Sequence, residues 1–158
     1  MTPGATPEAL WPYALELYGR PGAQPLLLEL QDAHGQCVPF LLWSLWTATS
    51  GRPIDAAQAA ACAELARAWQ DAAIAPLRQL RRDLKASAKT EQVQARIRSG
   101  VKALELEAER MLLQMLEETS PAPAAPSSGG LQALRLAARA WGAKAPAALL
   151  DQLASLAA

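Results

Sequence analysis

Three titratable side chains lie close together in the sequence, at Glu29, Asp32 and His34, and His34 is the only histidine of the chain. Glu29 and Asp32 are three residues apart, a spacing that puts both on one face of a helix. Carboxylates beside an imidazole can bind a metal ion or carry out acid–base catalysis. No HExxH and no second Glu-x-x-His motif completes such a site. We therefore favour a structural role, with Asp32 capping a helix or pairing with Arg20, and keep an enzyme or metal site as an alternative.

Nucleophilic and nucleotide-dependent chemistry have little support. Cys37 would need His34 as its base from only three residues away, and the GxSxG, GxxxxGK[ST] and GxGxxG motifs are absent. Cys37 and Cys62 lie on separate predicted helices without a CxxC motif, so we expect free, buried thiols. Trp43 and Trp46 are one helical turn apart and are interpreted as core rather than as a ligand pocket. No cofactor and no metal are predicted.

The charge distribution is the most informative feature. Fifteen basic and fifteen acidic residues cancel, which argues against global attraction to nucleic acid or anionic membranes. Residues 78–102 nevertheless carry a net +6 and residues 103–118 a net −4. A local basic patch can bind phosphate backbones or an acidic protein partner, whereas the lack of aromatic residues in it argues against base stacking. The candidate binding residues are Arg78, Arg81, Arg82, Lys85, Lys89, Arg96, Arg98 and Lys102.

The same basic stretch has a simpler interpretation. Arginine and lysine stems can pack along Leu77, Leu80 and Leu84 while their charged ends stay in water. The acidic residues Glu105 and Glu109 can pair with arginines at helical spacing or across the predicted turn, and surface pairs of that kind stabilise a fold by only ~0–1 kcal/mol each.

The composition predicts an all-α fold. The 158 residues include 36 Ala and 26 Leu, which favour helices, but only six Val and Ile, which strands prefer. We expect short helices starting at about Pro7 (capped by Thr6) or Pro12, then near 25–33 and from Pro39. The helix from Pro39 is apolar nearly all round, so it is predicted to be the central buried element.

Two long helices are predicted to follow. The first starts with a capping box formed by Asp55 and Gln58, and Pro76 is expected to kink it without ending it. The second starts after Thr90 and is roughly 40 Å long. Antiparallel packing would make a hairpin with one projecting end. Its predicted packing stripe is Val93, Ile97, Val101, Leu104, Ala108, Met111 and Met115.

We divide the chain into a helical domain at 1–118, a Pro/Ala/Ser/Gly linker at 119–130 and a helical tail at 131–158. The tail combines Leu131, Leu134 and Trp141 with Arg135 and Arg139, a basic amphipathic pattern. Such a tail can fold back on its own domain, bind a partner or lie on a membrane surface.

Four segments carry a family resemblance. They are WPYALELYGRPG at 11–22, LLLELQD at 26–32, FLLWSLW at 40–46 and VKALELEAER at 101–110. With them the chain resembles a proteobacterial family of short uncharacterised proteins, domain of unknown function 2390, over roughly residues 8–118. The resemblance implies a helical bacterial protein and brings no catalytic residue.

The N-terminal residues have no basic n-region and no apolar h-region, so we expect no signal peptide, and the apolar run from Pro39 to Ala48 is about half as long as a transmembrane span. We therefore expect a cytoplasmic protein without a transmembrane segment or a DNA-binding signature. The sequence favours a non-enzymatic protein–protein interaction or adaptor protein. RNA or ribosome binding through the basic hairpin tip is the first alternative, and an enzyme or metal site around Glu29, Asp32 and His34 is the second.

Overall fold

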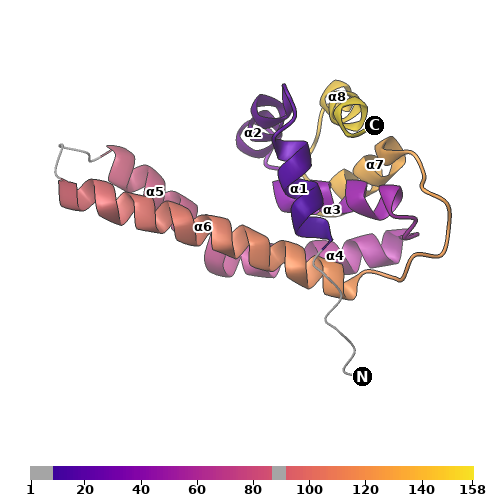
Figure 1. Ribbon diagram of the computed structural model, residues 1–158, viewed down its shortest axis with the longest axis horizontal. Coiled ribbons are helices and arrows are strands. Elements are labelled where there is room, and N and C mark those ends of the chain that lie inside the picture. The colour runs from indigo at the N-terminus through magenta and orange to yellow at the C-terminus, as the bar shows by residue number, and fades with distance from the viewer. Residues whose placement is uncertain (1–8, 87–91) are drawn as a thin grey trace.

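The computed structural model describes residues 9–86 and 92–158. Within these residues the protein is all-α, and a long antiparallel pair of helices extends from a bundle of shorter helices (Figure 1). The described helices are α1 (Leu10–Tyr18), α2 (Ala23–Asp32), α3 (Val38–Thr49), α4 (Ala56–Trp69), the π-helical turn η1 (Gln70–Ile74), α5 (Ala75–Ala86), α6 (Gln92–Thr119), α7 (Gly130–Trp141) and α8 (Ala147–Ala157).

The central helix is α3, as its apolar sequence predicts. Every residue from Pro39 to Ala48 is buried, because α1, α2, α6 and α7 all pack against this helix. The Trp43 ring stacks on the Phe40 ring at 5.2 Å between centroids, and its indole N–H donates to the Ser120 hydroxyl at 2.7 Å. Trp43 and Trp46 are therefore core residues.

The first long helix begins as predicted and continues past Pro76. Asp55 and Gln58 form the capping box at its N-terminus, with the Asp55 carboxylate accepting from the Gln58 backbone N–H at 2.8 Å. Pro76 does not end the helix: it is the second residue of α5, and the π-helical turn η1 directly precedes α5. Proline cannot supply the N–H of a regular α-helical turn, and a π-helical turn is a local way to absorb such a defect.

The start of α1 differs in detail from the prediction. Thr6 and Pro7 lie outside the described residues, and Pro12 falls inside the first turn of α1 rather than at its start. Ala9, at the N-cap, has no side chain that could accept a hydrogen bond. Glu117 of α6 accepts from the backbone N–H groups of Ala9 and Leu10 instead, at 2.8 and 3.1 Å. A carboxylate at a helix N-terminus also interacts favourably with the helix dipole.

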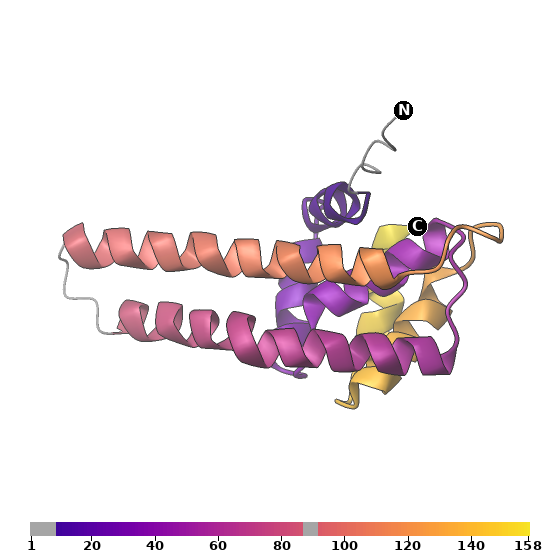
Figure 2. The same ribbon diagram turned by 90° about the horizontal axis from the view of Figure 1, so that it is seen from below.

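The hairpin forms as predicted, with α5 packed against the N-terminal half of α6 and its end projecting from the bundle (Figure 2). The predicted packing stripe of α6 is wrong at four positions, because Val93, Ile97, Leu104 and Met111 are exposed. The buried face is rotated from it by a fraction of a turn and consists of Val101, Glu105, Ala108, Leu112, Leu113 and Leu116.

The C-terminal helices share the core of the molecule. α7 packs against α3 and α4, α8 packs against α2 and α7, and the Trp141 indole N–H donates to the Gly35 carbonyl at 2.8 Å. The preceding segment contacts the end of α3, where Gly51 accepts from the N–H groups of Ala124 and Ala125. Of the three alternatives for the tail, the structure shows folding back on the rest of the chain.

None of the helices in the described part of the chain is long and apolar enough to cross a membrane.

Candidate functional site

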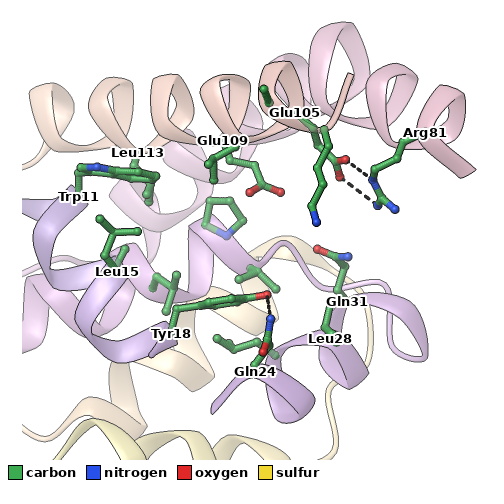
Figure 3. Close-up of a pocket in the computed structure, with 18 of the residues that line it drawn as sticks. Trp11, Leu15, Tyr18, Gln24, Leu28, Gln31, Arg81, Glu105, Glu109 and Leu113 are labelled. Atoms are coloured by element: carbon green, nitrogen blue, oxygen red, sulfur yellow. Dashed lines mark hydrogen bonds and ion pairs between the residues drawn. The ribbon is translucent and has the colours of Figure 1, made fainter. Parts of the chain in front are cut away.

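A groove of about 630 Å³ lies between α1, α2, the start of α3 and one face of α6 (Figure 3). Its floor is apolar and includes the buried residues Leu27, Pro39, Leu42 and Leu113. Cavities of this size are large enough for a drug-sized molecule or several side chains of a bound peptide. The groove is therefore the first place to look for a binding site.

Three leucines around the groove are exposed to solvent, and each comes from a different helix. Leu15 of α1 is 51% exposed, Leu28 of α2 is 42% exposed and Leu106 of α6 is 50% exposed. All three line the groove. A single exposed leucine is ordinary, but apolar side chains gathered around one concavity indicate a binding surface.

One wall of the groove is a network of ion pairs between α5 and α6. Arg81 donates from Nε to the Glu105 carboxylate at 2.6 Å, and Arg78 donates from Nε to the same carboxylate at 3.1 Å. The second branch of the Arg78 guanidinium reaches Glu109 at 3.3 Å. Glu105 is only 7% exposed, so its charge requires such partners.

The two carboxyl groups of this wall have opposite pKa shifts. Burial raises the pKa of Glu105, but hydrogen bonds from Arg81 and Arg78 and their positive charges outweigh burial and lower it below its usual value. Burial also raises the pKa of Glu109, and there the attraction of Arg78 is too weak to reverse the effect. Glu105 is thus a fixed anion of the wall, whereas Glu109 holds its proton more readily than an ordinary glutamate.

The rim of the groove carries polar groups that a partner can reach. Lys102 is exposed on α6 and forms no ion pair within the described residues. Gln31 projects from α2, and Gln24 donates to the Tyr18 hydroxyl at 3.5 Å (Figure 3). The groove therefore offers an apolar floor, neutral hydrogen-bonding groups and one free cation.

The predicted basic residues do not form one continuous free patch. Arg78 and Arg81 face Glu105, and Arg82 pairs with Asp32 of α2 at 3.0 Å. Lys89 lies outside the described residues. The others are the exposed Lys85, Arg96 and Lys102 and the half-buried Arg98.

The polar cluster predicted from Glu29, Asp32 and His34 is not assembled into a metal site. Glu29 and Asp32 are exposed and His34 is half-buried, and Asp32 pairs with Arg82 rather than with Arg20. No group of three or more His, Cys, Asp or Glu residues in the described ranges could hold a metal ion.

Both cysteines are free and buried, as predicted. Burial raises the pKa of the Cys37 thiol to about 12, so at neutral pH it is protonated and unreactive. Cys62 contacts the Thr119 hydroxyl at 3.8 Å. Neither thiol is placed to act as a nucleophile.

Sequence reasoning missed the groove leucines, because Leu15 and Leu28 look like additional members of the apolar faces of their helices. Their positions in the helices could have identified them. Leu15 and Leu28 lie beside the rows of residues that α1 and α2 bury, and a leucine outside the buried row is a candidate for a binding surface. Which of these leucines meet at one groove depends on how three separate helices pack.

The described part of the chain is all-α, with an apolar groove between a long helical hairpin and two short N-terminal helices. The model of a family of proteins of unknown function, DUF2390, matches residues 9–116, and the chain belongs to that family. The matched region includes the whole groove, whereas α7 and α8 lie beyond it. No curated protein and no solved structure matches the chain.

Proposed function

We propose that this protein is a non-enzymatic adaptor whose groove binds an amphipathic segment of a partner protein. The observation that carries the proposal is the meeting of Leu15, Leu28 and Leu106 around one cavity, each with about half of its surface in water. Insertion of apolar partner side chains between them would remove this surface from water. Each Å² of buried apolar surface stabilises the complex by roughly 25 cal/mol. An amphipathic helix laid in a groove is a common form of such recognition.

The polar groups of the groove indicate the chemistry of the partner. Lys102 is the cation that remains free beside the apolar floor, whereas Arg81 is already neutralised by Glu105. A partner segment with an acidic side chain next to its apolar residues would complement Lys102. Complementary charges raise the association rate and fix the register of a bound segment.

A catalytic role for the groove has weaker support. Glu109 is the one acid there whose pKa is raised, a property that also occurs in catalytic acids. Burial explains this shift, and the Arg78 guanidinium, 3.3 Å from the Glu109 carboxylate, opposes it. Within the described residues Glu109 belongs to no group of three or more His, Cys, Asp or Glu side chains that could hold a metal ion, and burial raises the pKa of both cysteine thiols.

The test is affinity capture of binding proteins from a lysate of the source cells, with the wild-type chain and two matched variants. Leu106→Asp places a charge in the groove. Leu104→Asp places the same charge two residues away on the same helix, where Leu104 is 57% exposed and does not line the groove. A groove partner is expected to bind the wild type and Leu104→Asp, and to bind Leu106→Asp at least ~30-fold more weakly, as for a typical hot-spot residue.

Capture of the same protein by all three chains would contradict the proposal. A Lys102→Glu variant extends the test, because it should weaken capture at low salt and have little effect at high salt. RNA binding is the other possible outcome. Capture that disappears with nuclease, and with Arg96→Glu and Arg98→Glu rather than Leu106→Asp, would replace the groove by the basic hairpin.

A further inference from the structure

The side of α6 away from the groove has a second apolar surface, here called the outer stripe, formed by Val93, Ile97, Leu104 and Met111. These residues are 58%, 51%, 57% and 45% exposed. Their spacings of four, seven and seven residues place them within about 40° of one another around the helix. None of them lines the groove. In Figure 2 the hairpin lies in front of the other helices, so no described element covers this side.

Gly100 lies between Ile97 and Leu104 along α6, at one edge of the outer stripe. Glycine in the interior of a helix weakens that helix, and α6 gains no visible benefit from it, because a Cβ at this position would meet nothing within 4 Å. The absence of a side chain does allow another helix to approach closely. Within the described residues, the space beside Gly100 is therefore open to an approaching helix.

Charges beside the outer stripe point to the identity of that neighbour. Arg96 and Glu107 are both exposed, and neither forms an ion pair within the described part of the chain. They are eleven residues apart, close to three full turns, so they lie on the same edge of the stripe. When two copies of one helix pack antiparallel about a two-fold axis, equal edges face each other. Arg96 of each copy then faces Glu107 of the other.

We propose that the outer stripe binds a second copy of this chain, with the two α6 helices antiparallel. The register that pairs Arg96 with Glu107 also places, within one residue, Leu104 over Gly100 and Val93 beside Met111 of the other copy. By the two-fold symmetry, Leu104 of each copy lies over Gly100 of the other. Arg96 of each copy pairs with Glu107 of the other, which gives two ion pairs. The groove is on the other side of α6, so the dimer presents two independent grooves.

Sedimentation equilibrium of the full chain tests the proposal with the two aspartate variants described above. At high micromolar concentration the wild type and Leu106→Asp are expected to have twice the 16.8 kDa mass of the chain, and Leu104→Asp the mass of one chain. A wild type that stays monomeric would overturn the proposal, as would a Leu104→Asp dimer or a monomeric Leu106→Asp. Helix content by circular dichroism verifies that each variant is folded.

Charge exchange gives a second test that does not depend on the apolar residues. Arg96→Glu and Glu107→Arg should each weaken the dimer by about tenfold or more, since each places like charges opposite each other. The double variant restores both pairs and should dimerise like the wild type. An equimolar mixture of the two single variants should form a heterodimer more tightly than either variant pairs with itself. Equal behaviour of the mixture and the single variants would refute the antiparallel register.

Discussion

Helices α3 and α5 are each twelve residues long, yet α3 buries ten residues and α5, all of whose residues are described, buries none. α3 has neighbours on every side, whereas α5 has α6 beside it and η1 at its end. The hydrophobic effect holds the bundle together, whereas α5 is joined to α6 by the ion pairs of Arg78 and Arg81 with Glu105. The bundle thus contains most of the core, while α6 keeps exposed apolar residues both at the groove and in the outer stripe.

The largest loss of stability is expected for a substitution in the bundle. Phe40→Ala removes a fully buried ring that stacks on Trp43 and packs near Trp141. Because the enclosed site cannot collapse, we expect a loss of about 3–5 kcal/mol in the free energy of unfolding. Urea denaturation followed by circular dichroism measures it. If Phe40→Ala lost no more stability than the hairpin variants below, the bundle would not be the main source of stability.

The second largest loss of stability is expected where residues 120–129 contact the bundle. Gly51 has φ +68°, and a Cβ there would overlap the Ala125 carbonyl oxygen. Gly51→Ala therefore strains the turn and displaces a backbone segment, and should lower the free energy of unfolding by about 2–3 kcal/mol. Limited proteolysis should also show faster cleavage between residues 120 and 129. Gly129→Ala is the control, because a Cβ at Gly129 meets nothing within 4 Å; equal effects of both variants would disprove the steric cause.

Glu105→Gln tests the ion pairs of the hairpin. It removes the negative charge shared by Arg78 and Arg81, and Arg78 keeps only its contact with Glu109. Loss of charge-assisted hydrogen bonds at a partly buried site should lower the free energy of unfolding by about 2 kcal/mol. The measurement is urea denaturation at neutral pH in parallel with Phe40→Ala. An unchanged midpoint would mean that apolar contacts alone hold α5.

The pH dependence should separate Glu105 from Glu109. The pKa of Glu105 is lowered, so its stabilisation is present above pH 4.5 and is lost as pH falls through the lowered value. The pKa of Glu109 is raised, so its contribution is complete below pH 4.5 and is lost as pH rises through the raised value. Between pH 3 and 7, the free energy of unfolding of the wild type should rise with pH relative to that of Glu105→Gln. Relative to that of Glu109→Gln, it should fall with pH. Slopes of the same sign would contradict these shifts.

The smallest effect is expected for the exposed pair between Arg82 and Asp32, whose side chains are 50% and 49% exposed. Solvent screens such a pair, so Arg82→Ala should change the free energy of unfolding by at most ~1 kcal/mol. Thermal unfolding at low and high salt measures the effect and its screening. A larger loss would show that this contact fixes α2 against the hairpin.

Much of the local structure could be predicted from the sequence. The apolar run from Pro39 to Ala48 predicted the central helix, and Asp55 with Gln58 predicted the capping box. Both signals are local, because they depend on the side chains within one or two helical turns. The same is true of the continuous helix across Pro76, although its π-helical turn was not predicted.

The candidate site was harder to predict, and α6 shows why. Leu104 and Leu106 are two residues apart and equally apolar, and periodicity alone placed Leu104 in the packing seam. In the structure Glu105 occupies that seam, because Arg78 and Arg81 from α5 supply the charge that lets it be buried. No pattern within α6 contains this information.

The helical class, most helix boundaries and the central position of α3 follow from the residues alone, because propensity, capping and hydrophobicity act over a few neighbouring residues. The packing of distant helices sets which arginines remain free, which face of α6 is buried and that Leu15, Leu28 and Leu106 line one groove. Those outcomes depend on contacts between helices that are distant in the chain. There, one buried charge and its partners can decide which face of a helix packs against the core.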